Sequence, residues 1–149
     1  MKNLFEKETL SEIEARISSL TPSSARQWGK MNVGQMLAHC RVSLQAATGE
    51  KDFPRLLIGK IFGRFARPQI MQEKPFPHNS PTNPGFIITG ETEFETERNK
   101  LLETINRFHE GGEIKCTSKP HSFFGNLTPL EWARLMYKHI DHHLRQFGV

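Results

Sequence analysis

Three histidines have the residue type and the spacing of a metal site. His139 and His143 are four residues apart near the C-terminus, and His39 lies in the first third of the chain. On a helix, residues i and i+4 lie on one face, with side chains near enough to share an ion. Three neutral imidazoles leave a divalent ion its full charge and open coordination positions, which is typical of catalytic rather than structural sites.

The helical periodicity predicts which histidines lie near the interior. The apolar stripe of the C-terminal helix consists of Ala133, Met136, Ile140, Leu144 and Phe147. With an advance of about 100° per residue, His143 lies about 60° from the centre of this stripe, His139 about 100° and His142 about 160°. We therefore expect His139 and His143 to flank the core, where solvent and substrate reach an ion, and His142 to face water. His39 borders the apolar stripe of its own helix in the same way.

Polar residues near the three histidines are candidates for hydrogen bonds to the imidazoles. Gln35 and Ser43 lie four residues before and after the first histidine, and Gln146 lies three residues after the last. Such partners fix the tautomer of a metal-binding imidazole. His121 lies in an aromatic turn before the C-terminal helix, and its sequence context is consistent with a pocket residue or with a packed turn.

Hydrophobic periodicity predicts an all-α fold. The predicted principal helices cover residues 6–19, 32–49 and 91–109, and a last helix runs from residue 128 to nearly the C-terminus. Apolar residues four apart over 53–65 predict a short additional helix, and only 86–89 and 113–116 resemble strands, too weakly for a sheet. We therefore predict a four-helix bundle with a long Pro-rich loop over 68–90, which would cover a site. The chain, residues 1–149, is expected to form one domain.

Composition and charge exclude several classes of protein. The net charge is +4, but most basic residues alternate with acidic ones, so we expect no nucleic-acid partner. No run approaches the roughly 18 apolar residues of a membrane span, and acidic residues interrupt every apolar run near the N-terminus. Cys40 and Cys116 lie far apart without metal-ligand spacing. We expect a cytoplasmic protein with reduced thiols.

The segment 51–67 differs from the rest of the chain. Five basic residues punctuate a strongly apolar sequence, and only Asp52 opposes them. We expect its Phe and Leu residues to complete the bundle or to form a homodimer interface. The alternative is an amphipathic basic helix that lies on an anionic membrane or a partner protein, in which case the chain would be a non-enzymatic binding protein.

Two motifs resemble those of a known superfamily. The C-terminal KHIDHHLRQFG, residues 138–148, resembles the HxxHHxxQ signature of the DinB/YfiT-like helical-bundle metalloproteins, and residues 34–39 resemble its partner motif. The resemblance covers nearly the whole chain and implies the same three histidines as ligands. Residues 121–125 and 131–132 resemble more closely an uncharacterised branch, a domain-of-unknown-function family. Residues 144–145 are Leu-Arg where many members have Arg-Gly, which affects the surroundings of the site and leaves the ligands intact.

The resemblance also implies a class of activity. Characterised relatives include transferases and isomerases that use a low-molecular-weight thiol, which implies attack by a metal-activated thiolate on a small-molecule electrophile. A metal-dependent hydrolase is the alternative enzyme, but its general base has no clear candidate in the sequence. The metal is left open among Zn, Ni, Fe, Mn and Co, because three-histidine sites accept all of them.

Overall fold

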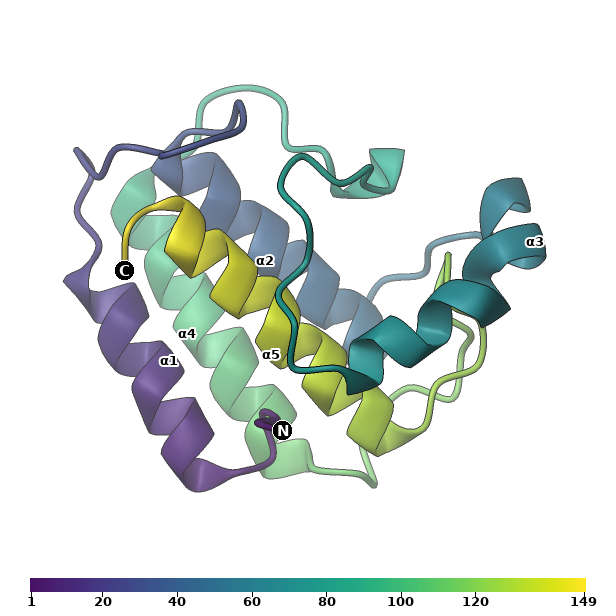
Figure 1. Ribbon diagram of the computed structural model, residues 1–149. Helices are drawn as coiled ribbons and strands as arrows, with labels where there is room; N and C mark the ends of the chain where they lie inside the picture. The colour runs from purple at the N-terminus through teal and green to yellow at the C-terminus, as the bar shows by residue number, and fades with distance from the viewer.

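The computed structural model describes residues 1–149 and is all-helical, as the sequence predicts (Figure 1). The five α-helices are α1 (Lys7–Ser19), α2 (Val33–Thr48), α3 (Leu57–Ala66), α4 (Phe94–Gly111) and α5 (Pro129–Gln146). Neither of the two stretches that weakly resemble strands is one. The only β-type pairing is an isolated bridge between His121 and Gly125.

Capping residues fix the starts of the two helices that carry the histidines. Asn32 and Gln35 form a capping box at the start of α2, and Thr128 and Glu131 form another at the start of α5. Each box satisfies backbone N–H groups that the first turn leaves unpaired. Gly49 ends α2 in the left-handed conformation, with φ 79°. The registers of α2 and α5 are therefore set by local sequence.

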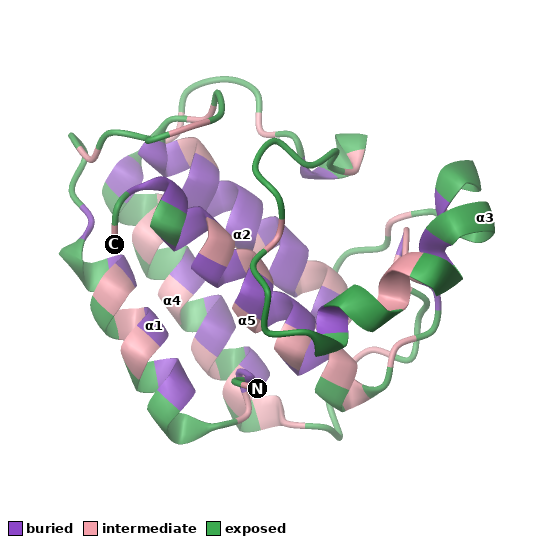
Figure 2. Cartoon of the chain, in the orientation of Figure 1, coloured by how far each residue is buried: buried purple, intermediate pink, exposed green.

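Four helices pack into a bundle. The helix α2 contacts α4 and α5, and α1 contacts the same two, so the order around the bundle is α1, α4, α2, α5 (Figure 1). The helices α1 and α2 thus lie diagonally across the bundle, as do α4 and α5, whereas α2 and α4 are neighbours. Their buried faces point inward (Figure 2). The largest fully buried apolar side chains are Trp132, Leu4, Ile13, Ile17, Leu20, Met36, Leu37, Leu44, Ile70, Leu101, Ile105 and Ile140.

Partly buried ion pairs connect the helices. Asp141 of α5 accepts hydrogen bonds from Arg16 of α1 at 2.8 Å and from Arg145, one turn along its own helix, also at 2.8 Å. Arg41 of α2 donates to Glu97 of α4 at 2.8 Å. A shift of the helices that separates such a pair would leave each charge poorly solvated. These contacts therefore favour one alignment of the helices.

The helix α3 lies away from the bundle (Figure 1). Its large apolar side chains are exposed, and only Gly59 and Gly63 are buried (Figure 2). The expectation that the Phe and Leu residues of this segment complete the bundle is therefore wrong. The physical reason is that the face turned to the rest of the chain is made of glycines, which allow close contact with backbone. No helix of the chain is both long and apolar enough to span a bilayer.

The Pro-rich segment 68–90 crosses the bundle beside α5 (Figure 1). It contains one complete 3₁₀ turn, Pro84–Phe86, and most of another, Arg67–Met71. Lys138 of α5 donates to the carbonyl oxygens of Gln69 and Gln72 at 2.6 and 2.8 Å. Phe86 is buried at the other end of the segment. The loop is thus attached to the bundle at both ends, over the surface between α2 and α5.

Candidate metal centre

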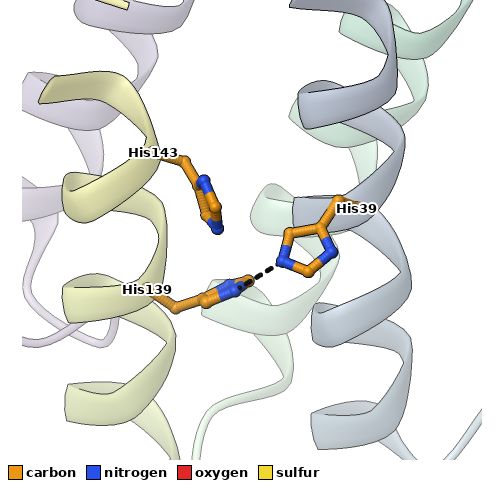
Figure 3. Close-up of side chains that lie close together, drawn as sticks. All are labelled: His39, His139 and His143. Carbon is orange, nitrogen blue, oxygen red and sulfur yellow. Dashed lines mark hydrogen bonds between the residues drawn. The ribbon is translucent and has the colours of Figure 1, made fainter. Parts of the chain in front are cut away.

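The three histidines selected from the sequence lie together between α2 and α5. His39 projects from α2 toward His139 and His143 on α5 (Figure 3). One ring nitrogen of each lies within 4.8 Å of the others, and the Nε2 atoms of His39 and His139 are 2.9 Å apart. Two nitrogens on one Zn²⁺ at about 2.0–2.1 Å each lie at most about 4.2 Å apart. In a tetrahedral site they lie about 3.3 Å apart, so a shared ion requires the Nε2 atoms of His39 and His139 to separate slightly and the widest pair to approach slightly.

The protein environment keeps these imidazoles neutral. His39 and His143 are only 3 % and 8 % exposed. Burial, and then repulsion from the ring of His39, lowers the pKa of His143 to about 3. Burial lowers the pKa of His39, and burial together with the other two rings lowers the pKa of His139 well below its usual value. Neutral imidazole is the form that binds a metal.

Hydrogen bonds orient two of the rings. His39 Nδ1 lies 2.8 Å from the carbonyl oxygen of Phe86, which can only accept, so His39 carries its proton on Nδ1. Gln146 donates from Nε2 to the carbonyl oxygen of Trp28 at 2.7 Å and therefore presents Oε1 to His143 Nδ1, at 2.9 Å. In both rings Nε2 therefore carries a lone pair and no proton. This is how metal-binding histidines are normally held.

His139 is the ring whose hydrogen bonds the protein does not complete. Since His39 Nε2 has no proton, His139 must donate from Nε2 when no cation lies between them. Its Nδ1 is then a bare, buried acceptor with no partner. Unpaired buried polar atoms are rare and costly. A cation would accept lone pairs from all three Nε2 atoms at once. His139 would then carry its proton on Nδ1, which has no partner in the protein in either case, so the donor set is compatible with a metal ion but this atom does not distinguish the two states.

The other predicted partners of the imidazoles lie elsewhere. Gln35 belongs to the capping box of α2 and also donates to the carbonyl oxygen of Gly90 at 3.2 Å. The Ser43 hydroxyl donates to the backbone carbonyl of His39 at 3.0 Å. Neither side chain contacts an imidazole, because each has a nearer backbone partner on its own helix or in the adjoining loop. Of the three polar candidates, only Gln146 contacts a ring.

His142 is less exposed than its helical position predicts. Its ring is partly buried and makes edge contacts with Trp28, Phe76 and His78, and Trp28 and His78 stack at 3.8 Å. Burial, and then the nearby His78, lowers the pKa of His142. The expectation that His142 faces water is wrong, because loops cover that side of α5. It remains outside the group of three histidines.

The expectation of a site open to solvent holds only in part, because His39 and His143 are buried and His139 is partly exposed. The ring of Phe86 lies edge-on to His39, so the Pro-rich segment covers this side of the site. A cavity of about 10 Å³, room for about one water, adjoins Phe86 and His121, and a hollow of about 330 Å³ lies near Phe147. None of the three clustered histidines lines either space. The loop therefore covers the site on the side of His39, while His139 is partly exposed.

His121 lies in a packed turn near this cavity. Its Nδ1 accepts hydrogen bonds from the backbone N–H groups of Phe123 and Phe124 at 3.0 and 3.1 Å, and its ring packs 5.2 Å from that of Trp132. Burial, and then the charge of Arg55, lowers the pKa of His121 to about 4. Of the two roles left open by the sequence, the contacts support the packed turn.

The carboxylates nearest in sequence to the ligands are engaged elsewhere. Asp141 pairs with Arg16 and Arg145, and Glu131 pairs with Arg67 at 2.5 Å as well as capping α5. The hydrogen bonds from Arg67 lower the pKa of Glu131. Cys40 is buried in the core, where burial raises the pKa of its thiol. None of these groups is available to the three histidines as a base or nucleophile.

Two contributors to the site are backbone atoms. The carbonyl oxygens of Phe86 and Trp28 set the orientation of His39 and, through Gln146, of His143. Every residue has a carbonyl, so no side-chain pattern identifies these two. The only signal in the sequence is that Phe86 lies in a long loop between helices. Such a loop is expected to cover a site, but the sequence does not show which of its carbonyl oxygens contacts a histidine.

Fold and site together define a helical-bundle protein with a largely buried three-histidine cluster. Residues 2–148 match the family described as "Protein of unknown function (DUF1569)", and the chain belongs to that family. No curated protein and no solved structure matches the chain.

Proposed function

We propose that this protein binds one divalent transition metal ion through His39, His139 and His143. The observation that carries the proposal is the convergence of three neutral imidazoles, two of which have their Nδ1 atoms held so that Nε2 carries a lone pair and no proton. The resemblance of the two histidine motifs to the DinB/YfiT-like metalloproteins supports the same ligands. Zn, Ni, Fe, Mn and Co all suit such a donor set.

The proposed activity is a metal-dependent reaction of a small molecule, with a thiol-dependent transferase or isomerase as the leading candidate. A divalent ion with three neutral ligands retains its charge and supplies Lewis acidity to a bound thiol or water. The chain's own residues orient the imidazoles and, through Phe86, cover the site on the side of His39. A low-molecular-weight thiol as the second reactant is inferred from the superfamily resemblance alone.

A metal-dependent hydrolase is the second candidate. Hydrolysis at such a site commonly uses a nearby general base. Asp141 and Glu131 are paired with arginines, so neither fills that role in this structure. This observation favours the thiol-dependent reaction, in which the nucleophile is brought by the cosubstrate. A cytoplasmic location, where thiols stay reduced, would suit that chemistry.

Metal titration of the purified protein tests the binding proposal. Chelator-treated wild-type protein should bind about one Co²⁺ or Zn²⁺ per chain, and His139→Ala should bind none tightly. Calorimetry or the absorption spectrum of bound cobalt measures this binding. His142→Ala is the matched control, since it removes a histidine from the same helix outside the cluster. Equal weakening in both variants would contradict the assignment of ligands.

Gln146→Ala tests whether the amide that holds the His143 ring strengthens metal binding. Loss of the partner that holds an imidazole typically weakens metal affinity by about 10–100-fold. We expect that weakening with an unchanged stoichiometry, measured in the same titration. Ser43→Ala is the control, because its hydroxyl contacts only the backbone of His39. An unchanged affinity in Gln146→Ala would contradict the proposed role of the amide.

The reaction class is tested by a screen of electrophiles. Metal-loaded wild-type protein should accelerate the loss of an electrophile only when a low-molecular-weight thiol is added. The His139→Ala variant should give no acceleration with or without the thiol. Turnover by water alone would instead support the hydrolase. Because metal binding is measured separately, failure of this screen leaves the metal proposal standing.

A further inference from the structure

The helix α3 presents a continuous apolar face to solvent. Five of its large side chains are between 55 % and 77 % exposed: Leu57, Ile58, Ile61, Phe62 and Phe65. Single exposed apolar residues are ordinary, but a group of them on one face marks an interaction surface. Ile58, Phe62 and Phe65 follow the 3–4 spacing of one helix face, as do Leu57, Ile61 and Phe65. The helix is amphipathic with its apolar side outward.

The opposite face of α3 fixes this orientation. A Cβ atom added to Gly59 would lie 2.7 Å from Cα of Phe123, and one added to Gly63 would lie 2.0 Å from the carbonyl oxygen of Phe123. Only glycine allows so close an approach to backbone. The N–H of Leu56, just before the helix, also donates to the carbonyl oxygen of Ser122 at 2.9 Å. The large side chains therefore point away because the glycines must face inward.

The charge of the molecule is concentrated beside this face. Segment 51–67 has five basic residues and one acidic residue, which accounts for the whole net charge of +4, since the rest of the chain is balanced. No acidic residue lies within α3. Lys60 and Arg64 make no ion pair, and the guanidinium of Arg64 lies 4.5 Å from the centre of the Phe65 ring. Free positive charge thus borders the apolar surface.

We infer that α3 docks on the surface of an anionic phospholipid bilayer. An apolar helix face flanked by unpaired Lys and Arg is the arrangement that inserts at a lipid–water interface, with the basic groups at the level of the headgroups. A second copy of this chain is a poorer occupant. A symmetric dimer brings the same surface of both copies together, so two segments of net positive charge would meet. The bilayer complements both properties of the surface.

Vesicle cosedimentation tests this surface with the intact protein. The protein should bind vesicles of equal parts phosphatidylglycerol and phosphatidylcholine, bind phosphatidylcholine vesicles much less, and dissociate at high salt. Each basic residue near an anionic surface raises the membrane binding constant about fivefold. Lys60→Gln with Arg64→Gln should therefore weaken vesicle binding about 30-fold. Lys30→Gln with Lys115→Gln is the control. It makes the same change in net charge at exposed positions outside segment 51–67 and should leave binding within about twofold of the wild type.

The apolar contribution is tested by Phe62→Ser with Phe65→Ser. Removing both rings from the interface should weaken vesicle binding by more than about 100-fold. Ile114→Ser, at a fully exposed apolar position far from the helix in sequence, should leave it unchanged. Circular dichroism checks that the helices persist. Equal binding to neutral and anionic vesicles, no binding to either, or a dimer in sedimentation velocity that the double Ser variant dissolves would each overturn the proposal.

Discussion

The helices α2 and α3 both repeat apolar residues every three or four positions, yet one buries them and the other exposes them. In α2 the stripe of Met36, Leu37 and Leu44 is at most 1 % exposed. In α3 the equivalent face points to solvent, and Gly59 and Gly63 face the protein. The comparison shows that periodicity identifies an apolar face but not what covers it. What covers it depends on the residues of the opposite face and on their neighbours.

The largest expected effect comes from the same kind of truncation made in both helices. Leu44→Ala removes a fully buried side chain and should lower the free energy of unfolding by about 2–5 kcal/mol, because it loses burial and leaves a cavity. Phe65→Ala, at an exposed position, should change it by less than about 0.5 kcal/mol. Urea unfolding followed by circular dichroism measures both. Comparable losses would mean that α3 is packed in solution.

Acidification probes the turn on which α3 rests. His121 has a pKa of about 4 in the folded chain against 6.5 for an ordinary histidine. The unfolded chain therefore binds this proton first, so its contribution to stability is complete above pH 6.5 and is lost as the pH falls toward 4. The loss is about 1.4 kcal/mol per pH unit, up to about 3 kcal/mol in total.

His121→Gln isolates that contribution. The amide oxygen can still accept the backbone hydrogen bonds of the turn but cannot take a proton at these pH values. The free energy of unfolding, measured by urea unfolding between pH 7 and 4, should therefore fall less steeply with pH in the variant. The difference in slope corresponds to the uptake of about one proton on unfolding. Identical slopes in the two proteins would show that His121 is not buried as a neutral ring.

A methyl group added between α3 and the turn at Phe123 should change the free energy of unfolding by a smaller amount. The Cβ of Gly63→Ala would meet the carbonyl oxygen of Phe123, so the helix must move or the turn must yield, at a cost of about 1–3 kcal/mol. Limited proteolysis of segment 51–67 should become faster. Lys60→Ala, an exposed position on the same helix, is the control and should leave both measurements unchanged. If Gly63→Ala behaves like this control, the close contact does not hold α3 in place.

Local signals in the sequence were sufficient for much of the fold. The predicted bounds of α2 and the predicted start of α5 agree with the structure to within one or two residues, because Asn32, Gly49 and Thr128 are strong caps. The order of helices around the bundle could not be predicted, because it depends on how whole faces pack. The same is true of α3, whose exposure depends on backbone contact with Phe123.

The candidate site divides in the same way. The i, i+4 spacing brings His139 and His143 to one face by helix geometry alone, and the border position of His39 turns it toward them. The depth of the site was not predictable, since it depends on Phe86 in a loop without periodicity. The expectation that His142 faces water was wrong for the same reason. Trp28 and His78 lie in two irregular segments and cover the face of α5 that helical periodicity assigns to solvent.

The most direct test of the proposed metal site is the metal content of the protein as purified, measured by elemental analysis without added metal or chelator. We expect about one transition metal ion per chain in the wild type and in His142→Ala. His139→Ala should contain essentially none while keeping its helical circular dichroism. Metal retained at the wild-type level in His139→Ala, or wild-type protein that neither carries nor takes up a transition metal, would contradict the proposal.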